Sequence, residues 1–357
     1  MAITPAPDEQ PFSPDRIVSL ISALPKAELH LHLEGTISAS TAVDLAARHG
    51  ITITTEEASQ HYAPGNFAQF LEAFKWVTSF LRTPADYALI TERMAEQLIS
   101  QNVVYAEITI SVGVMLLRKQ DPLANFEAIS QAAAKFEPRG LKLRWIFDAV
   151  RQFGPIAAAE VVKAATECVS QGVVAFGLGG DELAFPAADF RSVYELAADG
   201  GLHRLVHVGE IGDAASVREA VEILGVSRIG HGIGAINDPR VMDFLAERKV
   251  TLELCPTSNI RTSALARQLG DPAATIAQHP LPQFLRRGMR VTLSTDDPAM
   301  FQTTLVQEYG HAAEMGLNQQ EIMHLAEMSF QSSFLPADIK QRLISAMWTL
   351  QSSAARK

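Results

Sequence analysis

The feature that most constrains the fold of this chain is a series of short apolar runs that alternate with helical patterns. The runs are rich in Val, Ile and Leu, as parallel strands buried on both faces are. With an opening run inside residues 25–36 they number eight, and the other seven are Val103–Ile110, Leu141–Val150, Val173–Leu178, Leu205–Val208, Arg228–Gly232, Thr251–Leu254 and Arg290–Ser294. Eight strands, each followed by a helix, predict an α/β fold of the (β/α)8 TIM-barrel type, and a doubly wound sheet is the alternative.

The segments between these runs carry the signals that begin and end helices. Asp213 precedes one apolar periodicity, and Asp238 with Pro239 precedes another, so that an acidic cap is followed by a proline in the first turn. No internal repeat, low-complexity block or Gly/Ser linker divides the chain. We therefore expect a single barrel domain over residues 17–357 with a helical C-terminus. A flexible tail, residues 1–16, is expected before it because this stretch is proline-rich and lacks periodicity.

The connection between the first two strands, residues 36–102, is longer than a strand-to-helix connection requires. Ser38 or Ser40 can cap a helix that runs through Arg48. Apolar and aromatic residues then recur at helical spacing over 67–81, a stripe that is typical of core packing, and a lid over a pocket is the alternative. We expect an extra helical insertion after the first strand.

Composition excludes several classes of partner. The net charge of -10 and the absence of a Lys/Arg-rich run argue against nucleic acid. No stretch approaches the roughly 20 apolar residues of a membrane span, and the N-terminus is acidic and proline-rich, so we expect no membrane association and a cytoplasmic protein. Two cysteines, Cys168 and Cys255, are too few for a disulfide framework. The oligomeric state stays open.

Polar residues gather where the predicted strands end. They are His30, His32 and Glu34 on the first strand, residues 179–182 on the fourth, His207 and Glu210 on the fifth, His231 on the sixth, and Asp296 with Asp297 on the eighth. The carboxyl ends of barrel strands meet at one face, where barrel enzymes build their active sites. Each residue alone has a structural explanation, such as a hydrogen-bonded core histidine or a helix cap. Their joint placement favours a functional site.

The histidines in this group predict a metal centre. His30 and His32 are separated by one residue on an extended backbone, so both imidazoles point to the same face. Together with His207 and Asp296 they supply three nitrogens and one carboxylate, a set that suits Zn²⁺ better than Mg²⁺ or Ca²⁺, with iron, manganese or cobalt as substitutes. The fourth strand has no lysine that could be carboxylated to bridge two metals. We therefore expect one Zn²⁺ per chain, which lowers the pKa of a bound water to about 7.

Six motifs at these strand ends occur in a recognisable order. They are Ala27–Gly35, Gly179–Glu182, Val206–Glu210, Arg228–Gly232, Cys255–Asn259 and Ser294–Pro298. This series resembles the adenosine deaminase family of metal-dependent barrel hydrolases. The cytidine type of zinc deaminase is excluded because the chain has no Pro-Cys-x-x-Cys motif.

The resemblance implies a role for each site residue. It implies catalytic roles for Glu210, His231 and Asp296, substrate binding by His32, Glu34, Gly180 and Asp297, and metal ligation by His30, His32, His207 and Asp296. In this scheme Glu210 protonates N1 of a purine, while His231 orients the attacking water as a base or an electrostatic partner. Asp297 and the Gly180 N–H bind N7 and N3. A metal-bound hydroxide then adds to C6 and ammonia leaves, which is hydrolytic deamination of the 6-amino group.

The substrate is the point at which the sequence departs from the adenosine-specific pattern. Adenosine deaminases have Asp where this chain has Glu34, and the longer side chain crowds the site of the ribose 5′-hydroxyl. The Glu variant resembles adenine deaminases and 6-amino-6-deoxyfutalosine deaminases. Adenine deaminases usually carry a Ser-Ser-Glu type segment where this chain has Gly179–Glu182, which favours a nucleoside, adenosine or 6-amino-6-deoxyfutalosine. An added carboxylate would need a cation, and Arg118 or Arg151 could supply it or lie in a surface ion pair.

Three other functions compete with this prediction. The first is deamination of the free base adenine. The second is a purine-binding protein without turnover, which is disfavoured because every catalytic position holds a competent residue. The third is hydrolysis of an ester or phosphoester, which lacks the basic cluster or glycine-rich nest that a phosphate requires.

Overall fold

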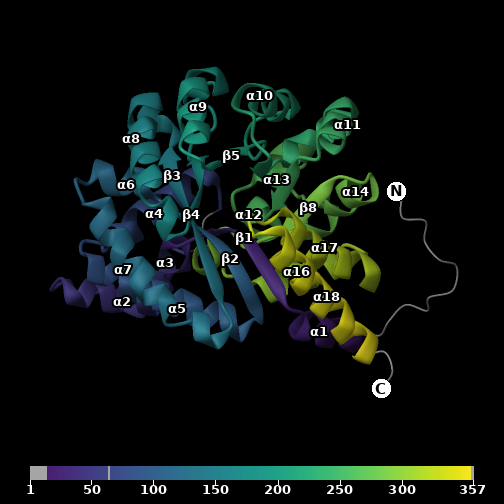
Figure 1. Cartoon of the computed structure of the whole chain (residues 1–357), viewed down its shortest axis with the longest axis horizontal. Coiled ribbons are helices and arrows are strands. Elements are labelled where there is room, and N and C mark those ends of the chain that lie inside the picture. The colour runs from purple at the N-terminus through teal and green to yellow at the C-terminus, as the bar shows by residue number, and fades with distance from the viewer. Residues whose placement is uncertain (1–13, 63–64, 355–357) are drawn as a thin grey trace, which may run out of the picture.

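The computed structural model describes residues 14–62 and 65–354 (Figure 1). Its strands are β1 (Lys26–His32), β2 (Val103–Ile110), β3 (Lys142–Val150), β4 (Val173–Gly179), β5 (His203–Val208), β6 (Arg228–His231), β7 (Thr251–Leu254) and β8 (Arg290–Leu293). Every neighbouring pair is parallel, and the order in the sheet follows the order in the sequence. A doubly wound sheet would reverse its order at a switch point. The predicted TIM barrel is therefore confirmed.

The two ends of the sheet meet at the site residues. Leu31 forms an isolated parallel bridge with Asp296. The Asp296 N–H donates to the His30 carbonyl at 3.0 Å, and the His32 N–H donates to the Asp296 carbonyl at 2.9 Å. The backbone bonds that join β1 to the end of β8 thus also fix the positions of three predicted site residues.

Helices surround the strands (Figure 1). They are α1 (Pro14–Ala23), α2 (Ala39–Arg48), α3 (Thr55–Gln60), α4 (Phe67–Thr78), α5 (Pro84–Ser100), α6 (Val112–Leu117), α7 (Pro122–Ala134), α8 (Gly154–Glu167), α9 (Arg191–Asp199), α10 (Ala214–Leu224), α11 (Pro239–Arg248), α12 (Pro256–Arg261), α13 (Ala264–Leu269), α14 (Leu281–Arg286), α15 (Pro298–Phe301), α16 (Leu305–Glu314), α17 (Gln319–Ser332) and α18 (Ala337–Ala354). Short 3₁₀ turns are η1 (Glu34–Thr36), η2 (Glu137–Arg139), η3 (Arg151–Phe153), η4 (Val169–Gln171), η5 (Ala187–Phe190), η6 (Ile233–Asn237) and η7 (Ile276–Gln278). In the described part of the chain, no helix has the length and apolar character needed to cross a membrane.

The predicted helix caps are present. The Ser38 hydroxyl accepts from the Thr41 N–H, the Asp213 carboxylate from the Ser216 N–H, and the Asp238 carboxylate from the Arg240 N–H. One prediction at the N-terminus is wrong. Helix α1 begins at Pro14, so the last three residues of the expected tail are helical, with proline in the first turn where its missing N–H is harmless. The rest of the expected tail lies outside the described residues.

The insertion after β1 consists of α2 to α5, as expected. Helix α4 carries the aromatic stripe as far as Thr78, short of the predicted end at residue 81, and the burial of the stripe changes along its length. Val77 and Leu81 are buried in the core, whereas Phe67, Phe70 and Phe74 are only half-buried. The Phe70 ring lies 5.1 Å from that of Phe301 in α15, which follows the site residues of β8. The C-terminal half of the stripe packs the core as predicted, and a lid function for its N-terminal half stays a prediction.

Candidate metal centre and active site

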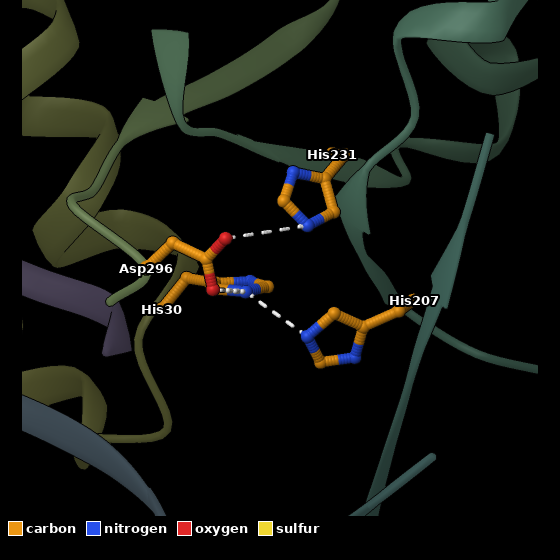
Figure 2. Close-up of side chains that lie close together, drawn as sticks. All are labelled: His30, His207, His231 and Asp296. Atoms are coloured by element: carbon orange, nitrogen blue, oxygen red, sulfur yellow. Dashed lines mark hydrogen bonds and ion pairs between the residues drawn. The ribbon is translucent and has the colours of Figure 1, made fainter. Parts of the chain in front are cut away.

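Four side chains from four strand ends converge in the barrel mouth. Figure 2 shows His30, His207, His231 and Asp296 pointing toward one another, and one ligand atom from each lies within 4.8 Å of the others. His30 and His32 lie on the same face of β1, and both are buried. His32 forms a second such group with Asp296 and Asp297. Residues more than 260 positions apart in sequence are thus brought into one cluster by the closure of the barrel.

The four predicted metal ligands have donor separations that suit a single ion. His207 Nε2 lies 3.1 Å from His30 Nε2 and 3.2 Å from His32 Nε2. Asp296 Oδ1 lies 3.3 Å from His30 Nε2 and 3.4 Å from His32 Nε2. Donors bound to Zn²⁺ at about 2.0–2.1 Å in a tetrahedral array lie roughly 3.3–3.4 Å apart. These four of the six separations within the set match the donor spacing around one metal ion with three nitrogens and one carboxylate.

Burial makes two of these imidazoles neutral nitrogen donors. It lowers the pKa of His32 to about 4, and it lowers the pKa of His207 well below its usual value, where the neighbouring His30 adds to the effect. The pKa of Asp296 lies well below its ordinary value although burial opposes this, because His30 and His231 stabilise the carboxylate. Neutral His32 and His207 and an ionised Asp296 are the forms that bind a metal, whereas His30, whose pKa is raised to about 10 by Asp296 and Glu253 against the effect of burial, must release a proton to bind one.

Buried partners orient the predicted ligands. The Glu253 carboxylate lies 2.9 Å from His30 Nδ1, which leaves Nε2 facing the cluster. Arg228 donates from Nε to the other Glu253 oxygen at 2.5 Å. The Ser258 hydroxyl donates to Asp296 Oδ2 at 2.7 Å, on the oxygen opposite the one nearest His30 and His32. Such outer contacts fix the ring and carboxylate orientations of a metal site.

Two site residues have a backbone conformation that residues other than glycine rarely adopt. His231 has φ 64° and Asp296 has φ 66°, both in the left-handed region. Non-glycine residues in this region are uncommon, and they concentrate where the surrounding structure enforces a functional geometry. At Asp296 the enforcing contacts are the bonds to β1 described above.

Glu210 is a buried acid next to the cluster. Its Oε2 lies 3.7 Å from His231 Nε2, and its Oε1 accepts from the Thr262 hydroxyl at 2.9 Å. Burial, reinforced by the charge of Asp296, raises the pKa of Glu210 to about 8. A carboxyl group with this pKa holds a proton at neutral pH and can act as a general acid.

The loop that carries Glu210 is held by one carboxylate. Glu182 accepts hydrogen bonds from four successive backbone N–H groups at 2.8–3.0 Å, those of Gly209, Glu210, Ile211 and Gly212. The sequence pattern marks Glu182 as part of a motif but gives it no role. Its contacts with a loop 27 to 30 residues further on could be found only in the folded chain.

A second polar chain, also missed by sequence reasoning, ends at His231. Asn259 Nδ2 lies 3.1 Å from His231 Nδ1, and Asn259 Oδ1 lies 3.1 Å from His279 Nε2. Asn259 ends the motif Cys255–Asn259, so the sequence contained a signal for it. No sequence signal singled out His279.

The predicted substrate-binding residues present unpaired polar atoms. Glu34 Oε1 accepts from the Ser111 N–H at 3.1 Å, whereas Glu34 Oε2 and Asp297 Oδ1 are buried without a hydrogen-bond partner. A Cβ at residue 35 would lie 2.1 Å from Asp297 Oδ1, so only glycine fits there. Gly180 has φ 95°, a value that places it outside the range of most side-chain-bearing residues. Buried polar atoms without a partner indicate a place for a ligand, because leaving them unpaired is unfavourable.

Among the described residues, neither arginine considered for an added carboxylate has an acidic partner in a surface ion pair. Arg151 is buried and donates to the carbonyls of Phe185 and His207, both at 3.2 Å. Arg118 is partly buried and donates to the carbonyl groups of Lys75 and Thr78 near the end of α4. Arg151 therefore supports the strand that carries His207, and Arg118 ties α4 to the barrel.

Comparison with known proteins gives a consistent result. The family model described as adenosine deaminase matches residues 25–350. The aminodeoxyfutalosine deaminase of Streptomyces avermitilis is 37% identical over 332 residues, 91% of this chain and 90% of that protein. The adenine deaminase of Chelativorans sp. is 32% identical over 324 residues, 90% of this chain and 97% of that protein. The crystal structure of adenine deaminase from Arthrobacter aurescens covers 92% of this chain and 100% of its own with a TM-score of 0.85 at 29% identity.

Proposed function

Because this chain belongs to the adenosine deaminase family, we propose that it hydrolyses the 6-amino group of an adenine nucleoside and releases ammonia. Glu210 is the observation that carries this proposal. It is a buried acid with a pKa of about 8, beside a cluster that fits one metal ion. A proton donor and a metal-held nucleophile on the two sides of a heterocyclic C–N bond are what hydrolytic deamination requires.

The cofactor is proposed to be one Zn²⁺ held by His30, His32, His207 and Asp296. The support is the donor set and its 3.1–3.4 Å separations. When bound, such an ion lowers the pKa of a water molecule to about 7 and so supplies a nucleophile at neutral pH. Glu253 and Ser258 hold His30 and Asp296 in the orientation that ligation needs.

The protein side of the reaction is proposed to proceed through four residues. Glu210 donates its proton to N1 of the purine, which makes C6 electrophilic, and Thr262 keeps its carboxyl group in place. Asp297, whose pKa is raised well above its ordinary value by burial and by Asp296, holds a proton that it can donate to N7. The Gly180 N–H binds N3, and His231 orients the attacking water.

A nucleoside is preferred over adenine as the substrate. The support is the chain's retention of Gly179–Glu182 and its 37% identity to two aminodeoxyfutalosine deaminases, against 31–33% for the adenine deaminases. Glu34 in place of Asp points to a substrate modified at the 5′ position, with 6-amino-6-deoxyfutalosine as the first candidate and adenosine as the second. Adenine is the alternative, since the solved adenine deaminase shares this fold over its whole length.

A substrate panel tests the proposal. Ammonia release should be followed with adenine, adenosine, 2′-deoxyadenosine, 5′-methylthioadenosine and 6-amino-6-deoxyfutalosine, and kcat/KM compared. At least one nucleoside should exceed adenine by about tenfold, a difference of roughly 1.4 kcal/mol. Adenine exceeding every nucleoside would establish the base-specific alternative. Binding of these compounds without ammonia release from metal-loaded protein would refute an enzymatic function.

A further inference from the structure

A buried chain of hydrogen bonds connects a backbone amide to His231. The Leu281 N–H donates to His279 Nδ1 at 3.2 Å. His279 Nε2 lies 3.1 Å from Asn259 Oδ1, and Asn259 Nδ2 lies 3.1 Å from His231 Nδ1. His279, Asn259 and His231 are at most 3% exposed, so water does not compete for these contacts.

The first group in this series of hydrogen bonds, the Leu281 N–H, can only be a donor. A backbone N–H can only donate, so the His279 Nδ1 that receives it carries no hydrogen. Burial lowers the pKa of His279 to about 3, and the ring is therefore neutral. A neutral imidazole without hydrogen on Nδ1 carries it on Nε2, and this N–H points at Asn259. Asn259 must meet it with its carbonyl oxygen, which turns the amide nitrogen toward His231.

We propose that Asn259 and His279 are positioning residues that hold His231 as the Nε2–H tautomer. The Asn259 amide donates to His231 Nδ1, so this nitrogen is an acceptor and the ring hydrogen lies on Nε2. On the opposite side of the ring, the ionised Asp296 favours a hydrogen on Nε2. Nε2 faces two carboxyl groups, with Asp296 Oδ2 at 3.8 Å and Glu210 Oε2 at 3.7 Å.

This assignment rests on the proposed function and decides between the two roles considered for His231. A nitrogen that already carries hydrogen cannot take a proton from the attacking water. His231 therefore acts as a hydrogen-bond donor that stabilises negative charge near Asp296, which is the electrostatic role. Asn259 and His279 do not reach the reacting atoms, and their effect passes through the His231 ring.

The tautomer can be measured without turnover. Zinc-loaded protein labelled with ¹⁵N-histidine should be examined by long-range ¹H–¹⁵N correlation, and a His231→Gln variant identifies the His231 signals by their loss. In the wild type, Nδ1 of His231 should resonate as an unprotonated nitrogen and Nε2 as a protonated one. His279 should show the same pattern. A hydrogen on His231 Nδ1 would overturn the proposal whatever the variants do.

Asn259→Asp tests the link directly, because the substitution keeps the shape and replaces the donor by an acceptor. The His231 hydrogen should move to Nδ1, and kcat should fall about 100-fold while zinc content is retained. Asn318→Asp, the same change at the cap of α17, should leave the His231 tautomer and kcat unchanged, since Asp also caps helices. An unchanged His231 pattern in Asn259→Asp would overturn the role of Asn259. If the predicted tautomers are observed but no purine releases ammonia, the proposed function is refuted and the tautomer assignment stands.

Discussion

Two buried groups of charged residues lie inside this barrel, and they differ in how completely their polar atoms are paired. The inner cluster is Arg228, Glu107 and Glu253. Arg228 donates to both carboxylates at 2.5 Å and to the carbonyls of Leu29 and Ser332 at 3.2 Å. The outer cluster, formed by the four predicted metal ligands and Glu34 and Asp297, contains two carboxylate oxygens without a partner.

The difference separates a structural role from a binding role. Unpaired buried polar atoms are unfavourable by about 1–3 kcal/mol each, so a site that keeps them is built for a polar partner that arrives with a ligand. The inner cluster needs nothing further, and Phe334 covers Arg228 with its ring centre 4.2 Å from the guanidinium. The two clusters touch at one point, where Glu253 pairs with Arg228 on one oxygen and His30 on the other.

Removing a ligand from the outer cluster should have the largest effect. Purified wild type should carry about one transition metal per chain, and His30→Ala and Asp296→Ala should lose both metal and activity, because each removes one of the four proposed donors. Elemental analysis and ammonia release measure this. His311→Ala, a change to a histidine on α16 that pairs with Glu314, is the control and should retain both. Two activity-linked metals per chain would contradict a mononuclear site.

Glu210→Gln, a change beside the outer cluster, should separate catalysis from metal binding. The variant should keep its metal while kcat falls by about 10²–10⁴-fold, since an amide cannot donate a proton as the carboxyl does. Steady-state kinetics and metal content report the two properties independently. Glu222→Gln, at an exposed ion pair on α10, should be normal. Near-normal turnover of Glu210→Gln would remove this residue from the mechanism.

Arg228→Met should show that the inner cluster serves stability. It leaves two buried carboxylates without their common partner, and the free energy of unfolding should fall by about 3–5 kcal/mol. Arg240→Met provides the comparison, because this arginine is exposed and its ion pair with Asp238, which solvent screens, should contribute far less to the free energy of unfolding. Urea unfolding of both variants tests this. Equal losses would show that the inner cluster is no more important to folding than a surface pair.

The sequence predicted the barrel and the outer cluster for the same reason. Strands buried on both faces must be apolar, so polar residues such as His207 and His231 stand out at their ends. The inner cluster and the clamp of Glu182 on the loop after β5 could not be predicted, because each joins residues through contacts that only the closed barrel creates. The start of α1 was missed because residues 1–16 are proline-rich and lack periodicity, although proline is favoured in a first turn.

The smallest expected effect concerns Glu34, which has one paired and one unpaired carboxylate oxygen. One of its oxygens is paired with the Ser111 N–H and the other is free, and burial raises its pKa to about 7. Glu34→Asp withdraws the carboxyl group by about one C–C bond, roughly 1.5 Å, which weakens the bond to Ser111 and opens room for a ribose 5′-hydroxyl. The ratio of kcat/KM for adenosine over 6-amino-6-deoxyfutalosine should rise about tenfold, or roughly 1.4 kcal/mol.

This last prediction is measured as a ratio, so loss of folded protein or metal cancels from it. Glu56→Asp, the same shortening on the exposed first turn of α3, should leave the ratio unchanged. An unchanged ratio in Glu34→Asp would mean that the free oxygen of Glu34 does not face the 5′ end of the substrate. Substrate choice would then have to come from Gly180, Asp297 and the half-buried aromatic face of α4.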